Sequence, residues 1–174
     1  MKYPYIKYNN KVDIHPLFSG LQGDPLIVDM SDTSLLFNDI DMHDQKKFQS
    51  YLNGLMKGNF SWGVTSYMEN RKKTLSQHPQ MIKEKRYFHL GLDITVPLGT
   101  PLNTPLTAIV KKSGEPFAYI GDFHENGNWF FHTHFQILTQ KAFDQGYISK
   151  GYCSAEYLAQ MNSLCPSPLS LFKI

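Results

Sequence analysis

Two stretches in which apolar and polar residues alternate constrain this chain more than any other feature. A two-residue period is typical of a β-strand with one buried face, and the stretches span residues 88–96 and 129–138. The polar positions of the two stretches are His89, Gly91, Asp93, Thr95, His132, His134 and Gln136. The alternation therefore predicts two strands, each with an apolar face and an opposite face that carries histidine.

Shorter patterns add further β elements. Strands are expected at residues 106–110 and 116–120, after a turn formed by residues 97–101. Residues 13–41 are rich in aspartate and turn-forming residues, which indicates short strands or loops. Together these segments predict a mainly β fold, an antiparallel sandwich or partly open barrel.

Two segments have helical spacing. Apolar side chains between residues 42 and 57 recur on one helical face, which predicts an amphipathic helix capped by Asp41 and stopped by Gly58. A second, short helix is expected after Ser154. The segment Gly63–Arg86 is rich in basic residues and has little periodicity, so we expect a solvated loop there.

Composition bounds the class of protein. The 174 residues are 41% hydrophobic, which suits one domain, and the net charge of +2 is too small to favour nucleic acid or anionic membrane as partners. The first residues contain no apolar run typical of a signal peptide, and no stretch approaches the ~20 apolar residues of a membrane helix. We therefore expect a cytoplasmic protein, with export by another route left open.

The chain is expected to divide into two parts and to hold its cysteines as thiols. An α/β extension is predicted at residues 1–62 and a β domain at residues 63–174. Cys153 and Cys165 are too few for a disulfide scaffold, and buried thiols are favoured over a second metal site with other histidines.

The polar residues of the two strands form a candidate metal site. Two histidines and one carboxylate are the ligands expected of catalytic zinc. His132 and His134 project from the same side of their strand, so one can bind a metal while the other reaches a substrate. His89 and Asp93 would lie ~13 Å apart on a straight strand, so the strand must bend, and Gly91 between them permits a kink. Alternatively, these histidines are structural residues of a metal-free β binding module.

These residues occur in strings that resemble the lysostaphin-type zinc metallopeptidases. The strings are His89-Leu-Gly-Leu-Asp93, the following Ile94-Thr-Val-Pro-Leu-Gly-Thr-Pro101, and Trp129-Phe-Phe-His132-Thr-His134-Phe-Gln-Ile137. A closer resemblance is to the peptidase-like module found fused to aminotransferase and kinase-like domains in cytoplasmic enzymes. The strings that support it are Tyr67-Met-Glu-Asn-Arg71, Gly121-Asp122, Glu125-Asn-Gly-Asn-Trp129 and Cys165-Pro-Ser-Pro168. The resemblance runs from about Gly63 to the C-terminus.

The resemblance implies a role for each residue. His89, Asp93 and His134 would hold zinc, and His132 would be catalytic. The implied fold is the β core of that family, and the implied substrate is a peptide or a peptidoglycan-like peptide. Tyr67, Glu69 and Arg71 would border the cleft, although an exposed Glu–Arg pair is the simpler interpretation of the last two.

One departure from the family concerns the interval between Asp93 and His132. The family carries further strands there and a Tyr-Gly-His-Leu-like string whose histidine is a second catalytic group, and this chain has no such string. Either a hairpin has been deleted, or residues of the native protein are absent between Ala108 and Gly114. His124 or Glu125 could act as the missing base, but loop residues of this kind are usually only solvated.

The sequence thus predicts a zinc-dependent endopeptidase or amide hydrolase. The alternative is a zinc-binding, catalytically impaired peptidase-like module with a recognition or regulatory role, which the missing histidine favours. Nothing in the sequence indicates the oligomeric state.

Overall fold

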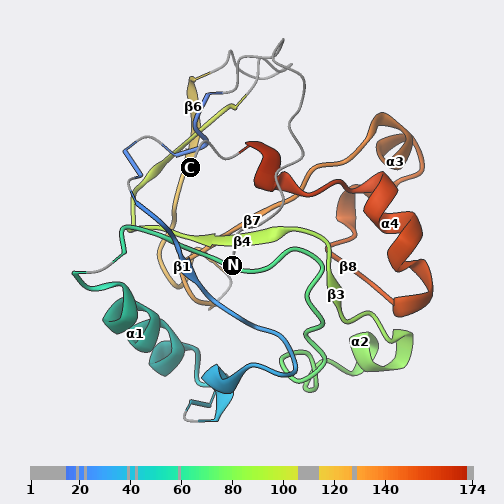
Figure 1. Ribbon diagram of the computed structural model, residues 1–174, viewed down its shortest axis with the longest axis horizontal. Helices are drawn as coiled ribbons and strands as arrows, with labels where there is room; N and C mark the ends of the chain where they lie inside the picture. Colours follow the sequence, from blue (N-terminus) through green and yellow to red (C-terminus); the bar gives the residue numbers. More distant parts are fainter. Residues whose placement is uncertain are drawn as a thin grey trace.

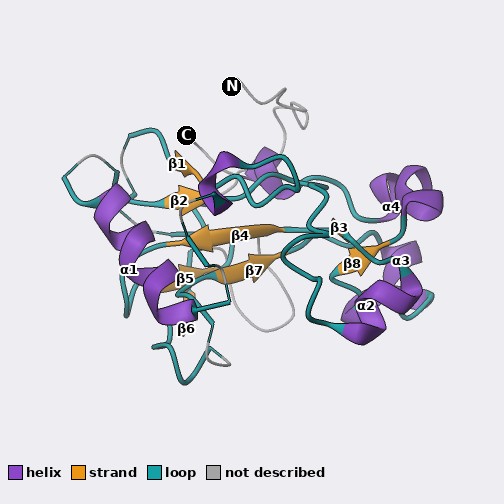
Figure 2. Ribbon diagram, turned by 90° about the horizontal axis from the view of Figure 1, so that it is seen from below, coloured by secondary structure: helices purple, strands orange, loops and turns teal. Residues whose placement is uncertain are grey.

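The centre of the molecule is a four-stranded sheet with the strand order β1-β2-β4-β7 (Figure 2). The computed structural model describes residues 15–18, 20–21, 23–38, 40–41, 43–58, 60–105, 114–126 and 129–171. The strands of this sheet are β1 (Leu26–Ile27), β2 (Gly63–Val64), β4 (Leu92–Thr95) and β7 (Thr133–Phe135). β1 runs parallel to β2, and the other two pairs are antiparallel.

Two small antiparallel pairs flank the central sheet. β3 (Phe88–His89) pairs with β8 (Tyr152–Cys153), and β5 (Pro101–Asn103) pairs with β6 (Pro116–Tyr119). β6 confirms the strand expected at residues 116–120, whereas the strand expected at 106–110 lies outside the described residues.

Helices occupy both ends of the molecule (Figure 1). The α-helices are α1 (Gln45–Met56), α2 (Pro79–Glu84), α3 (Gln140–Asp144) and α4 (Leu158–Leu164). Short 3₁₀ segments occur at Leu35–Phe37, Tyr147–Ser149, Ala155–Tyr157 and Pro168–Leu171. The described chain holds more helix than strand and no closed barrel, so the fold is mixed α/β and the expectation of a mainly β sandwich or barrel is corrected.

Helix α1 confirms the amphipathic pattern and corrects its cap. Asp44, not Asp41, accepts the hydrogen bond from the Lys47 N–H at the start of the helix. Phe48 is fully buried and meets the ring of Phe130 edge-on at 5.1 Å between centroids. The helix therefore anchors the segment that leads into β7.

The segment from residue 63 to 86 is not the solvated loop that its basic residues suggest. It contains β2 and α2, and its buried residues include Glu69, Arg71 and Thr74. All four of its lysines face solvent, which is why the composition misleads. Arg71 differs from them because carboxylates surround it.

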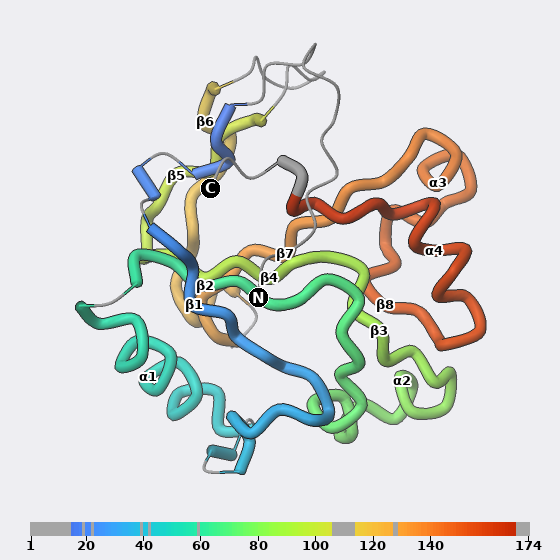
Figure 3. Tube along the Cα trace, viewed as in Figure 1, coloured from blue at the N-terminus to red at the C-terminus, as the bar shows by residue number. Residues whose placement is uncertain are grey.

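The strand predicted at residues 88–96 is broken in two at Leu90 and Gly91. The chain bends between β4 and β3 (Figure 3). β3 pairs with β8, while β4 enters the central sheet between β2 and β7. A β-carbon on Gly91 would lie 2.7 Å from Cε1 of His134 and 2.8 Å from the carbonyl oxygen of Phe135. The predicted break at this glycine is confirmed, and the close approach of β7 leaves no room for a side chain there. All four residues of β4 are buried, so this strand has no solvated face.

The strand predicted at residues 129–138 is also shorter than expected. Only Thr133–Phe135 forms β7, because Phe130 leaves the alternation and enters the core beside Phe48. The helix expected after Ser154 is confirmed by Ala155–Tyr157 and α4. The division at residue 62 stays a prediction, and β1 and β2 pair across it. Within the described ranges, no helix is long and apolar enough to cross a membrane.

Candidate metal centre

The three residues predicted to hold a metal lie together where β3, β4 and β7 meet. Nε2 of His89 is 2.9 Å from Nδ1 of His134. Oδ1 of Asp93 lies 3.4 Å from Nε2 of His89 and 3.3 Å from Nδ1 of His134. Asp93 and His134 are direct partners in the β4–β7 register, so their side chains share one face of the sheet. The break at Gly91 brings His89 to the same point.

The donor set and its spacing fit a small divalent cation. Two ligands held at about 2.0–2.2 Å by a tetrahedral zinc lie about 3.3–3.6 Å from each other. The separations of 2.9, 3.3 and 3.4 Å are within a few tenths of an ångström of that range. Two imidazoles and one carboxylate are also the donor types of catalytic zinc sites. His89, Asp93 and His134 can therefore hold a metal ion with little movement.

His132 faces the same point without joining the closest group. Its Nε2 lies 3.8 Å from Oδ1 of Asp93, and its Nδ1 lies 2.7 Å from the carbonyl oxygen of Phe130. The ring stacks on that of Phe130 at 4.4 Å between centroids. Burial lowers the pKa of His132 and so favours the neutral ring, whose Nδ1 proton the Phe130 carbonyl accepts. Nδ2 of Asn126 lies 3.0 Å from the same ring nitrogen. Nε2 is then an acceptor directed at the cluster.

A buried ion-pair network supports the carboxylate ligand. Arg71 donates from Nη1 to Oδ2 of Asp93 at 2.5 Å and from Nε to Oε1 of Glu69 at 2.7 Å. Burial alone would raise the pKa of Asp93, but the guanidinium outweighs it and holds that pKa well below its usual range. Asp93 is thus ionised, with Oδ2 occupied by Arg71 and Oδ1 directed at the imidazoles. The expected exposed Glu–Arg pair is instead buried.

His134 is oriented by a neighbour on its own strand face. Its Nε2 is 3.1 Å from Oε1 of Gln136, whose amide in turn donates to the carbonyl of Lys150 at 3.2 Å and to the sulfur of Cys165 at 3.4 Å. Gln136 accepts the proton on Nε2 of His134, and Asp93 faces Nδ1 at 3.3 Å. Burial alone would lower the pKa of His134, but the hydrogen bonds to Asp93 and Gln136 outweigh it and raise that pKa. A metal bound at Nδ1 would therefore take the place of a proton there. The alternation had already placed Gln136 on the face of the two histidines.

His89 is positioned by packing, unlike His134, whose second ring nitrogen makes a hydrogen bond. It is almost fully buried, and burial lowers its pKa to about 4, so the ring is neutral near pH 7. Its Nδ1 is buried and has no hydrogen-bond partner among the described residues. The ring is positioned by packing instead, with Tyr152 at 5.1 Å and His134 at 4.7 Å between centroids.

The cluster opens into a pocket of about 460 Å³. The lining residues outside the cluster include Trp129, Ile148 and Tyr152, so apolar and aromatic groups surround the polar centre. The Tyr152 hydroxyl accepts a hydrogen bond from Nη1 of Arg71 at 3.3 Å. Its own proton is therefore available to a group in the pocket.

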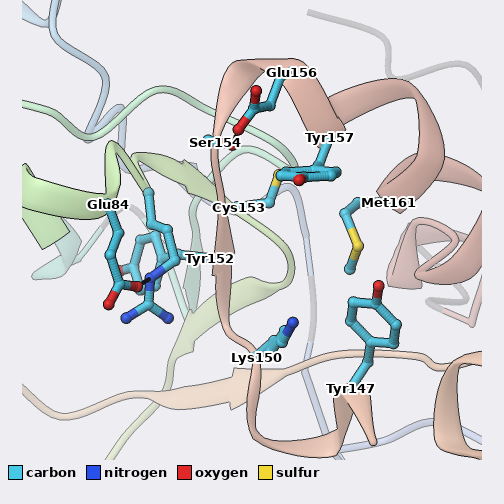
Figure 4. Close-up of a pocket in the computed structure, with 10 residues that line it drawn as sticks. Glu84, Tyr147, Lys150, Tyr152, Cys153, Ser154, Glu156, Tyr157 and Met161 are labelled. Carbon is cyan, nitrogen blue, oxygen red and sulfur yellow. Dashed lines mark hydrogen bonds and ion pairs between the residues drawn. The ribbon is translucent and has the colours of Figure 1, made fainter. Parts of the chain in front are cut away.

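Tyr152 also lines a second pocket, of about 390 Å³ (Figure 4). The cations of the second pocket are already engaged, because Arg86 pairs with Glu84 at 2.6 Å and Lys150 lies 4.4 Å from the ring of Tyr147. The described histidines do not line it. The three candidate metal ligands line the pocket at β7 and not this second pocket.

The other candidates from the sequence lie apart from the cluster. Glu125 accepts a hydrogen bond from the Asp122 N–H at 2.9 Å and lines a neighbouring hollow, whereas His124 does not line the metal pocket. Tyr67 donates its hydroxyl to the carbonyl of Cys165. Both cysteines are buried free thiols, as predicted.

Comparisons with known proteins add no relative. No protein-family model, curated protein or solved structure matches the chain. The interpretation of the site therefore depends on its own geometry.

Proposed function

We propose that this protein is a zinc-dependent peptidase or amide hydrolase of the lysostaphin type. One observation carries the proposal. Nε2 of His89, Oδ1 of Asp93 and Nδ1 of His134 converge at the floor of an open pocket, with Nε2 of His132 beside them. Convergence of this donor set with a further basic nitrogen is what hydrolysis of an amide at a metal requires.

Each residue then has a defined task. Zinc held by His89, Asp93 and His134 would supply a Lewis acid that polarises the scissile carbonyl and acidifies water. His132 accepts a proton, or donates a hydrogen bond once protonated, at the position where charge develops on oxygen. Arg71 keeps Asp93 ionised. Tyr152 lies close enough to the pocket to donate its hydroxyl proton to the substrate.

A second candidate is a zinc-binding module that recognises peptides without cutting them. It is favoured by the composition of the pocket, where the described lining contains His89, His132 and His134 and no fourth histidine. In that case the metal and the pocket would serve recognition alone.

Zinc content and peptide hydrolysis test the proposal together. Elemental analysis should give about one zinc per chain, lost in His134→Ala and retained in His132→Ala. Zinc-loaded protein should cleave a blocked glycine-rich or peptidoglycan-like peptide, and His132→Ala should cut it about 10²–10³-fold more slowly. Bound zinc without hydrolysis would favour the recognition module. Failure to bind zinc after reconstitution would overturn both and leave a metal-free binding module.

A further inference from the structure

The strand that carries His134 is an edge of the central sheet. β7 pairs with β4 on one side, and among the described residues no strand pairs with its other side (Figure 2). His134 is the middle residue of β7 and its most exposed one. An unpaired strand edge is a row of backbone donors and acceptors open to another extended chain.

The register shows which backbone groups face outward. Thr65 donates its N–H to the carbonyl of Asp93 at 3.0 Å, and Asp93 donates its N–H to Oγ1 of Thr65 at 2.9 Å. The backbone groups of Asp93 therefore point toward the β2 side, which makes Asp93 and His134 a non-hydrogen-bonded pair of the antiparallel ladder. In such a pair the N–H and C=O of His134 point away from β4. The described structure gives neither group a hydrogen-bond partner.

Two hollows follow β7 on either side of its exposed histidine. One, of about 370 Å³, lies between the end of β6 and the start of β7 and is lined by Tyr119, Gly121 and Thr133. The other is the metal pocket, which His134 and Gln136 line. His132 lines both, so the hollows meet at the proposed catalytic histidine.

We propose that an extended peptide binds as an added strand on the outer edge of β7, exchanging backbone hydrogen bonds with the N–H and C=O of His134. Strand neighbours lie about 4.8 Å apart, so the peptide would run directly beside the residue that offers Nδ1 to the metal. The inference rests on the proposed function and names its substrate class. That class is a flexible, extended peptide recognised through its main chain, with residues on both sides of the metal.

Strand addition gives a signature that other binding modes lack. In an added strand, alternate residues of the peptide direct their N–H groups toward the protein. The probe is an acetylated, amidated hexapeptide of glycine and alanine, which offers backbone and almost no side chain. N-methylation at alternate positions should weaken its binding about tenfold or more, while N-methylation at the positions between them should have little effect.

Amide hydrogen exchange locates the binding edge on the full chain. We would measure it by NMR with zinc present and with the His132→Ala substitution, so that cleavage of the peptide is slowed. Exchange at the His134 amide should slow about tenfold at saturating peptide. The Ile27 amide is the matched control, because its neighbours Leu26 and Val28 donate to β2 and its own N–H faces the opposite sheet edge. Its exchange should not change.

The outcomes separate this inference from the proposed function. Hydrolysis by the unsubstituted protein without slowed exchange at His134 would overturn strand addition and leave the peptidase standing. Slowed exchange and the alternating N-methyl pattern without hydrolysis would support strand addition and remove the peptidase. Failure of the probe to bind would also overturn strand addition, because recognition through the main chain needs no particular side chain.

Discussion

The candidate metal centre has two sides that are built in different ways. The buried side consists of Glu69, Arg71, His89 and Asp93, and all four residues are almost fully buried. The open side consists of His132, His134 and Gln136, and the side chain of His134 is 35% exposed. The buried side is joined by charge pairs, whereas the open side is joined by hydrogen bonds to backbone and amide groups. The comparison shows that one side fixes the carboxylate and the other leaves the metal position accessible.

The buried side also sets the charge that a cation would meet. Asp93 and Glu69 share the single guanidinium of Arg71, so the network holds two carboxylates against one cation. Burial raises the pKa of Glu69 despite that pairing, while Asp93 stays ionised. Because Arg71 occupies Oδ2, Asp93 presents one oxygen to the imidazoles. We infer that Asp93 binds a metal through Oδ1 alone.

The largest effect on stability is expected from removing the positive charge of Arg71, which pairs with both carboxylates of the buried side. Arg71→Met leaves two carboxylates buried without their partner, which should lower the free energy of unfolding by about 3–5 kcal/mol. Urea denaturation in the presence of chelator measures this without a contribution from metal binding. The double variant Glu69→Gln with Arg71→Met should recover part of the loss.

Arg86 supplies the matched control for this prediction. It pairs with Glu84 at 2.6 Å but at the surface, so Arg86→Met should cost about 0–1 kcal/mol. Equal losses for the two arginine variants would show that the buried network does not fix Asp93.

The junction between the two sides should be the next most sensitive position. A β-carbon at Gly91 would press on the His134 ring and on the Phe135 backbone, so Gly91→Ala should destabilise the protein by about 1–3 kcal/mol and displace His134 from the metal position. Gly151 is the control, because a β-carbon there would lie 3.8 Å from the same ring, an ordinary contact. Zinc titration and urea denaturation of both variants measure the difference. Similar zinc affinities for the two would contradict the assigned role of Gly91.

The sequence predicted which residues cluster better than it predicted the fold. His89, Asp93 and His134 could be selected because ligands two or four residues apart on strands are constrained by local geometry, and Gly91 was the one residue that allowed them to meet. The extent of the strands could not be read in the same way. Phe130 fits the aromatic pattern of a strand, but packing against Phe48 from a distant helix removes it from β7.

The network at Arg71 shows why the other contacts of the site could not be predicted from the sequence. Arg71 and Asp93 are joined across 22 residues, and the segment around Arg71 has the composition of a solvated loop. Only tertiary structure shows that this one arginine is buried between carboxylates. Gln136 was predictable in part. The alternation placed it on the same strand face as the two histidines, but its hydrogen bonds could not be predicted from the sequence.

The smallest effect is expected on the open side, from the residue that orients His134. Gln136→Leu removes the acceptor for the Nε2 proton of His134, so the ring is no longer oriented with Nδ1 toward the metal position, and zinc affinity should fall about 10–100-fold. Folding stability should change little by comparison with Arg71→Met, because Gln136 carries no charge and is not part of the buried network. Competition with a chromogenic zinc chelator measures the affinity.

Gln140→Leu is the control for this substitution. Gln140 makes an exposed hydrogen bond to Asp144 at 2.8 Å on α3, away from the metal position, so its replacement should leave zinc affinity unchanged. An unchanged affinity in Gln136→Leu would mean that His134, like His89, is positioned by packing rather than by its second nitrogen. Packing would then position the imidazoles on both sides of the centre. The two sides would differ only in the ion pair between Asp93 and Arg71, which belongs to the buried side.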